Sequence, residues 1–348
     1  MSDEPSQLPI DDAVEMFISK REVDSSPKTI RSYQTSLDLF VDWCEENDIE
    51  TVGELTGWHL EQWEQGRKGD GIAAVTLKGN LSALRQFLKY LGRIEAVGQE
   101  FFKKVRLPNL SVEQESSDIK LATTDAEALL KWYRNSPKVY GTNQHAILEV
   151  VWNTGARIGG IQALDIGHYE PESGALMFEH NPPATPLKND EKSERVVAIP
   201  EAVCDVLDVY IERERWDKRD DDGRRPLFSS RQGRASDTSI RSWMYLATQP
   251  CLHTDCPHGE EPHNCEYRHR NKASQCPSSR SPHQVRTGSI TWQSHWAASV
   301  GLRPKVISER VDASIQTIRR HYDKATELEK FAKRRQQFTS NLDISEYV

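Results

Sequence analysis

The sequence has no run of about 18 apolar residues, the length that a helix needs to cross a membrane. It also has no apolar leader, because the chain opens with the polar and acidic residues Met1-Ser2-Asp3-Glu4. These two absences predict a cytoplasmic protein that has no membrane partner and carries no export signal.

Positive charge is in the minority, since 45 Lys and Arg face 53 Asp and Glu, which leaves a net charge of -8. Taken alone, this balance argues against nucleic-acid binding. The distribution favours it, because residues 76–106 carry few acids and a series of cations: Lys78, Arg85, Lys89, Arg93, Lys103, Lys104 and Arg106. Basic faces on an acidic body fit a polyanion ligand, or a halophilic protein with a solvating acidic surface.

A length of 348 residues predicts two domains. Apolar residues at helical spacing predict four N-terminal helices, at residues 11–20, 28–44, 60–65 and 75–91. Ser26 is placed to cap the second helix, with Pro27 in its first turn. The polar stretch that follows reads as a linker, so we assign residues 8–106 to a helical domain, 107–120 to the linker and 121–348 to a second domain.

The second domain is predicted to be mainly helical, with one small β-hairpin. The hairpin pairs residues 175–179 with 195–199 and carries Lys188 and Lys192 near its tip. The glycines around Arg157 predict that one helix ends and another begins there. Helices are expected at 124–133, 144–153, 200–213, 239–246 and 326–338.

Four of the six cysteines gather in one segment, residues 251–276, together with His253, His258, His263 and His269. Without an export signal, such a set favours metal over disulfides. We expect a structural zinc site in this insertion, bound by Cys251, Cys256, Cys265 and Cys276. The irregular spacing leaves His258 or His263 open as substitutes, and a flexible loop with reduced thiols is the plain alternative.

The stretch from Ser281 to Lys324 places a tyrosine among cations. His283-Gln284-Val285-Arg286 is followed by Arg319-Arg320-His321-Tyr322-Asp323-Lys324. Tyrosine is a poor nucleophile at its usual pKa of about 10. Cations that also hold a phosphate would allow Tyr322 to attack phosphorus.

Thr154-Gly155-Ala156-Arg157, a hairpin lysine, His283-x-x-Arg286 and Tyr322, in this order, resemble the tyrosine recombinases of the phage-integrase family. The stretch from Pro27 to Tyr33 is similar to the family's core-binding domain. The resemblance implies an N-terminal four-helix SAM-like domain and a tyrosine-recombinase catalytic domain that here has a Cys/His-rich insertion.

By this resemblance, Arg157, His283 and Arg286 hold the phosphate, Tyr322 is the nucleophile, and Lys188 protonates the departing 5′ oxygen, with Lys192 as its alternative. The implied activity is site-specific DNA recombination or integration through a 3′-phosphotyrosyl intermediate. It needs no catalytic cofactor.

The resemblance also implies how the protein meets DNA. Double-stranded DNA is the expected partner, and four protomers act on two sites. The helix at 75–91 would face the duplex with Lys78, Arg85 and Lys89, and the helix at 326–338 would dock on a neighbouring protomer.

Two departures resemble a divergent, haloarchaeal-type branch. The family usually has His or Trp about nine residues before the tyrosine, where this chain has Ala313. The adjacent Asp312 is a poor substitute, because an anion repels phosphate. Gly160 stands where the family often has an acid three residues after the first arginine. These gaps leave open an alternative, a DNA-binding protein of the same fold with reduced catalysis.

Plain structural roles also stay open for single residues. Arg157 can be a cation at a helix end, and Tyr322 a core tyrosine. Lys188 can be an ordinary turn lysine, and His283 can cap its helix.

Overall fold

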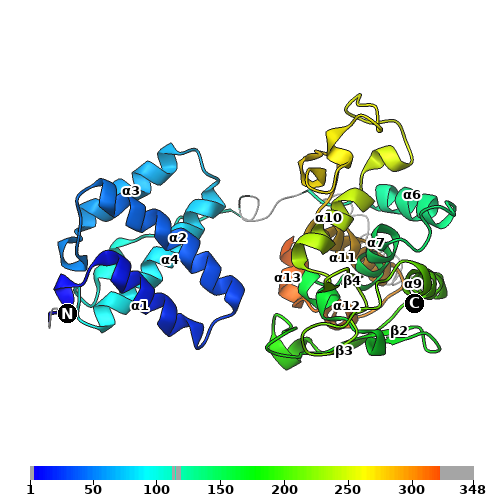
Figure 1. The fold of residues 1–348 in the computed structure, drawn as a ribbon, viewed down its shortest axis with the longest axis horizontal. Helices are drawn as coiled ribbons and strands as arrows, with labels where there is room; N and C mark the ends of the chain where they lie inside the picture. Colours follow the sequence, from blue (N-terminus) through cyan, green and yellow to red (C-terminus); the bar gives the residue numbers. More distant parts are fainter. Residues whose placement is uncertain (1–3, 112–113, 115–118, 322–348) are drawn as a thin grey trace, which may run out of the picture. The chain divides into compact units, whose positions relative to one another are not determined.

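The computed structural model describes residues 4–111, 114 and 119–321 of the chain. Tyr322 and the predicted helix at 326–338 lie outside these described residues. The chain divides into two compact units, Met1–Ser117 and Asp118–Val348, and the division falls within the predicted linker (Figure 1).

The described residues of the N-terminal unit form a bundle of four α-helices with three short 3-10 turns. Its helices are α1 (Ile10–Glu22), α2 (Pro27–Glu46), α3 (Gly57–Gly69) and α4 (Ala74–Arg93); its 3-10 turns are η1 (Pro5–Gln7), η2 (Val52–Glu54) and η3 (Phe101–Lys104). Every predicted helix is present, and each is longer than its apolar stretch suggested.

Local sequence explains where these helices begin and which face they bury. The Ser26 hydroxyl accepts a hydrogen bond from the Thr29 backbone N–H at 3.2 Å, and Pro27 occupies the first turn of α2. Helix α2 then buries Leu37 and Phe40 completely, in a core that it shares with α1, α3 and α4.

The second unit is also mainly helical. Its helices are α6 (Thr123–Arg134), α7 (Asn143–Thr154), α8 (Ile158–Ala163), α9 (Glu201–Arg213), α10 (Asp237–Ala247), α11 (Pro282–Ser299), α12 (Pro304–Val311) and α13 (Ile315–His321). Its 3-10 turns are η4 (Ile166–His168), η5 (Asp190–Ser193), η6 (Pro250–Leu252), η7 (Glu266–Arg268) and η8 (Ala273–Gln275).

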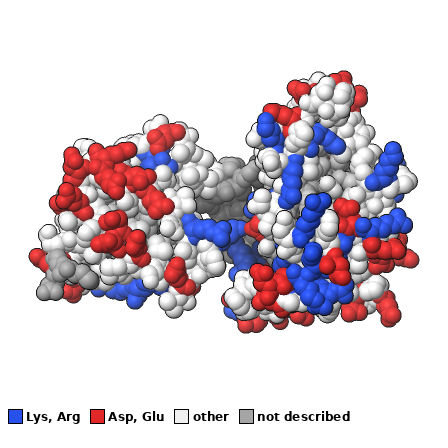
Figure 2. All heavy atoms as spheres, in the orientation of Figure 1, with Lys and Arg blue, Asp and Glu red and all other residues white. Residues whose placement is uncertain are grey.

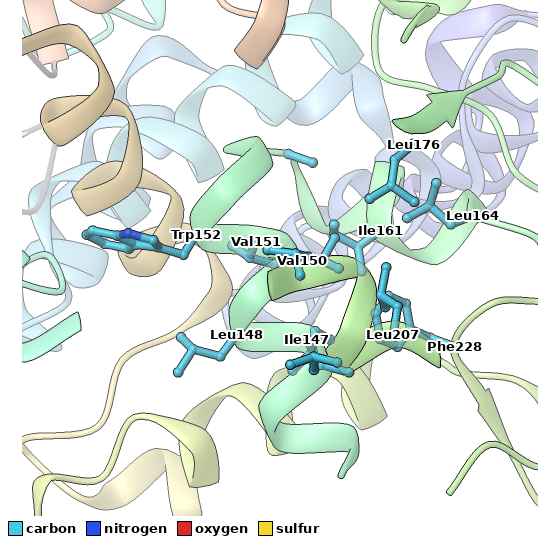
Figure 3. Close-up of a cluster of buried hydrophobic side chains, with 14 of the residues drawn as sticks. Ile147, Leu148, Val150, Val151, Trp152, Ile161, Leu164, Leu176, Leu207 and Phe228 are labelled. Atoms are coloured by element: carbon cyan, nitrogen blue, oxygen red, sulfur yellow. The ribbon is translucent and has the colours of Figure 1, made fainter. Parts of the chain in front are cut away.

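Helix α7 is the central helix of this unit. It is apolar around nearly its whole circumference, and it packs against α6, α9, α10 and α11. Figure 3 shows Ile147, Leu148 and Val150 of α7 within the buried cluster, with Leu207 of α9 and Phe228 nearby. Because α7 is fixed on several sides, its C-terminal end is a rigid place from which to present a side chain.

The sheet is larger than the single hairpin that the sequence predicted. Three antiparallel strands run in the order β1 (Tyr169–Glu170), β2 (Ala175–Phe178) and β3 (Arg195–Ala198), with Phe178 opposite Arg195. A separate pair is formed by β4 (Ser229–Ser230) and β5 (Gly233–Arg234). None of the described helices is both long and apolar enough to cross a membrane.

Candidate active site

Arg157 stands at the break between α7 and α8. Helix α7 ends at Gly155, which has a φ of 59° and donates its N–H to the Val151 carbonyl. Arg157 is then the N-cap residue of α8, with extended backbone. The predicted helix junction is present, and it turns the Arg157 side chain away from the core, where it stays 29% exposed.

Arg286 reaches the same junction from α11. Ser281 and Gln284 form a capping box at the start of that helix, and Pro282 lies in its first turn. The Arg286 side chain is only 3% exposed. Its Nη1 donates to the Gly155 carbonyl, and its Nη2 donates to the Asp312 carbonyl at 3.3 Å.

Asp312 joins the two arginines. It follows α12 in the left-handed conformation, with a φ of 51°. Its carboxylate accepts a hydrogen bond from Arg157 Nη1 and another from the Ser193 hydroxyl, at 2.8 Å. Asn189 Nδ2 lies 3.3 Å from the other carboxylate oxygen. Asp312 therefore does not stand in for the missing His or Trp, as a residue facing phosphate would; it pairs with Arg157.

Two further arginines, which no motif had marked as site residues, lie around Asp312. Arg195 donates from Nε to the Arg310 carbonyl at 2.9 Å and stacks on the Phe178 ring, 4.2 Å from its centroid. Arg310 donates to the Asn153 carbonyl at 2.8 Å, so it ties α12 to the end of α7. An arginine at the start of a predicted strand was the available signal for Arg195.

The cluster has an excess of positive charge. The pKa of the Arg195 guanidinium is lowered to about 10, chiefly by burial; Asp312 raises it, and Arg286, Arg157 and Arg310 contribute to the lowering. Burial also lowers the pKa of Arg310. With four guanidiniums near one carboxylate, the cluster can bind an anion such as a phosphodiester.

The loop between β2 and β3 contacts Asp312 through the neighbours of the two candidate lysines. Lys188 directly precedes Asn189, and Lys192 directly precedes Ser193. Both lysines are exposed. Because each stands one residue from a donor to Asp312, the choice between them stays open.

His283 lies on the first turn of α11, exposed and three residues before Arg286. Residues at this spacing share a helix face, so His283 and Arg286 point to the same side of α11. Tyr322, the predicted nucleophile, directly follows α13 and lies outside the described residues.

Ala313, at the position of the missing His or Trp, is buried. It is 7% exposed and packs in a small apolar cluster with Ile307, Val311 and Ile318. Gly160 is also buried, and a Cβ there would lie 3.3 Å from the Phe178 ring.

The three predicted DNA-binding residues lie on α4, outside its buried face. Lys89 is exposed, Lys78 is half-buried, and the Arg85 guanidinium lies 5.6 Å from the centroid of the Phe102 ring. Figure 2 shows mainly acidic patches on the visible face of the N-terminal unit, whereas Lys and Arg form several patches on the second unit. DNA contact by α4 stays a prediction.

The Cys/His segment folds back on itself. Gln249 Nε2 donates to the Tyr267 carbonyl at 2.7 Å, and His258 Nε2 lies 3.0 Å from the Ser278 hydroxyl. All four of its cysteines are free thiols. Among the described residues, no three His, Cys, Asp or Glu side chains already form a metal-binding group.

Comparison with known proteins agrees with this architecture. The family model of the phage integrase N-terminal SAM-like domain matches residues 15–94. Tyrosine recombinase XerC of Shigella flexneri serotype 5b (strain 8401) is 26% identical over 153 residues, which cover 43% of this chain and 49% of XerC. The chain thus spans about half the length of the curated relatives it matches.

Solved structures share the fold of the whole chain at low identity. The Tn1549 transposon integrase, in complex with circular intermediate DNA, matches with a TM-score of 0.64 and 14% identity, over 95% of this chain and 100% of that one. A lambda integrase dimer bound to a core site matches with a TM-score of 0.62 and 11% identity, over 92% and 80%. The matched N-terminal domain, the likeness to XerC and the shared fold together support the tyrosine recombinase, or phage integrase, family.

Proposed function

We propose that this protein is a site-specific DNA recombinase that cleaves and rejoins DNA through a 3′-phosphotyrosyl intermediate at Tyr322. One observation carries the proposal. Arg157, from the break between α7 and α8, and Arg286, from α11, both bind Asp312 within a cluster of four guanidiniums and one carboxylate. Such a cluster suits a group whose negative charge grows during the reaction.

In the proposed reaction, the Tyr322 oxygen attacks the scissile phosphorus, and the bond from phosphorus to the 5′ oxygen breaks. Arg157 and Arg286 stabilise the charge on the non-bridging oxygens, each arginine contributing several kcal/mol in typical cases. His283 orients an oxygen or moves a proton, and Lys188 or Lys192 protonates the departing 5′ oxygen. A second 5′ hydroxyl reverses the step and rejoins the strand.

We further propose duplex DNA as the partner, with four protomers acting on two sites. Solved structures of the same fold support the first part, since the Tn1549 integrase is in complex with circular intermediate DNA and the lambda integrase dimer is bound to a core site. The mass of the protein on two joined sites, measured by light scattering, tests the number of protomers.

We also propose a structural zinc in the segment of residues 251–276. Support comes from the fold of the segment, in which Arg268 donates to Gln249 at 3.2 Å; Gln249 precedes Cys251 by two residues, and Arg268 follows Cys265 by three. Burial raises the pKa of the Cys251 thiol, and the nearby Cys256 and Cys276 raise it further, whereas Arg268 lowers it. Zinc would draw these thiols into one site as thiolates.

A trapped covalent adduct tests the catalytic proposal. A binding site is first selected from random duplex DNA, and the selected duplex is then nicked at each position in turn. A nick close to the cleavage point lets the short fragment that carries the free 5′ hydroxyl diffuse away, so that the strand is not rejoined and the enzyme stays linked to DNA. We expect an adduct that survives denaturation and disappears in Tyr322→Phe.

Binding without any adduct is the result that would favour the alternative, a DNA-binding protein with reduced catalysis. The assay is run in dilute buffer and in several molar KCl, because the acidic composition of the chain fits a protein that works in high salt. Ala313 motivates this alternative, because it supplies no donor where the family usually has one.

A further inference from the structure

The Asp312 carboxylate has partners on two separate parts of the second unit. Arg157, between α7 and α8, and Ser193, in the loop before β3, donate to one oxygen, and Asn189 lies near the other. The Asp312 main chain also accepts from Arg286. This single residue therefore contacts both candidate phosphate-binding arginines and the loop that carries the candidate lysines.

The contacts of Asp312 indicate that its side chain holds Arg157 in place and does not itself lie where the anion would bind. The Asp312 side chain is only 16% exposed, and its oxygens face the loop residues as well as Arg157. Arg157 contacts it through Nη1 and stays 29% exposed, so the outer side of the guanidinium remains accessible. An arginine has five N–H donors, which is enough to bind a carboxylate on one side and a phosphate on the other.

The backbone at Asp312 shows why this residue type suits the position. With a φ of 51°, it lies in the left-handed region that Asn and Asp adopt more readily than other non-glycine residues. Its N–H closes the C-terminal end of α12 on the Ser308 and Glu309 carbonyls. The end of α12 thus fixes the backbone that carries the carboxylate, independently of the contact with Arg157.

We propose that Asp312 is a positioning residue for the recombination reaction. It orients Arg157 and fixes the loop between β2 and β3 against the two arginines, so that the phosphate-binding groups and the lysine are aligned together. The inference rests on the proposed function. It assigns to Asp312 an orienting role that the buried Gly160, with no side chain, is unable to fill.

Asp312→Asn tests this role, because asparagine keeps the shape and the left-handed backbone but removes the charge that holds Arg157. We expect the rate of adduct formation on the nicked duplex to fall about 10- to 100-fold, as misplaced catalytic groups typically cause. Affinity for the intact duplex should change less than about twofold. The matched control is Asp48→Asn, an exposed aspartate with a φ of 55° in the N-terminal unit, whose rate should equal that of the wild type.

Two results would overturn the inference while leaving the proposed function in place. One is an Asp312→Asn rate equal to that of the wild type. The other is an equal loss of rate and DNA affinity together with a lower unfolding midpoint, which a merely structural role predicts.

If the wild type forms no adduct, the proposed function fails, and crystal structures then decide the inference separately. A displaced Arg157 guanidinium in Asp312→Asn supports the positioning role. A guanidinium in its wild-type place contradicts it.

Discussion

Gly155 is the C-terminal cap of α7. Its φ of 59° lies in the left-handed region, which residues with L side chains rarely adopt. A Cβ at this position would lie 3.0 Å from Val311 Cγ1 and 3.3 Å from Ile290 Cγ1. We predict that Gly155→Ala lowers the free energy of unfolding by about 2–3 kcal/mol, from backbone strain and overpacking together. Chemical unfolding followed by tryptophan fluorescence measures this loss.

The matched control is Gly159→Ala, four residues further along the chain on the short helix α8. A Cβ there meets nothing within 4 Å, and the position is helical. Alanine should therefore leave the stability unchanged or raise it by up to about 1 kcal/mol. If Gly159→Ala lowered the free energy of unfolding as much as Gly155→Ala, neither backbone strain nor contact with Val311 would explain the loss in Gly155→Ala.

Glu149 on α7 makes the stability of the second unit depend on pH. Its side chain is fully buried and accepts from Arg134 Nε and Nη2 at 2.6 and 2.9 Å. Burial raises the pKa of Glu149, but hydrogen bonds from His145 and Arg134 outweigh it, so the pKa in the folded protein lies below the ordinary 4.5. A lowered folded pKa means that this stabilisation is present above pH 4.5 and is lost as the pH falls below it.

We predict that Glu149→Gln lowers the free energy of unfolding at pH 7 by about 2–3 kcal/mol, because charged hydrogen bonds are replaced by weaker ones. It should also flatten the fall in stability below pH 4.5. Urea unfolding over a series of pH values measures both effects. Glu127→Gln, an exposed glutamate on α6, is the control, and an equally flattened profile there would contradict the assignment.

At the scale of elements, the sequence predicted the long helices because each has an amphipathic or apolar pattern that spans several turns. Helix α4, predicted at 75–91, runs from Ala74 to Arg93. The strands β1, β4 and β5 were missed because each has only two residues, too few to show an alternation of apolar and polar side chains. Helix α12 has only eight residues and was not separated from its surroundings.

The candidate site was predictable only where a motif marks a residue. Arg157 and Arg286 stand in such motifs, and the structure brings both to Asp312. The roles of Asp312 and Arg195 depend on contacts between residues more than a hundred positions apart, such as Arg195 with Arg310, and no local pattern encodes them.

The zinc proposed for the segment of residues 251–276 can be measured directly. We predict about one zinc per chain in protein that has never met a chelator, and a lower unfolding midpoint after its removal, because structural zinc stabilises the fold that binds it. Elemental analysis by mass spectrometry measures the content.

Cys256→Ser should lose the zinc, whereas Cys204→Ala, at a buried cysteine of α9 outside the segment, should keep it. Zinc-free wild-type protein would contradict the prediction. Equal zinc in both variants would remove Cys256 from the ligand set.

At the scale of the whole molecule, a net charge of -8 means that the proposed binding of DNA would depend on local basic faces. We predict that α4 supplies one such face. Replacing Lys78, Arg85 and Lys89 together by Gln should weaken duplex binding and flatten its dependence on salt. Each phosphate contact contributes about 0.9 to the slope of log affinity against log salt, so the slope should fall by about 2–3.

The control removes three exposed cations of the second unit, Lys131, Lys138 and Arg213, and therefore makes the same change in net charge. If binding depended only on net charge, both triple variants would lose the same slope. A clear difference between them, measured by fluorescence anisotropy from low to molar salt, would place the contact on α4.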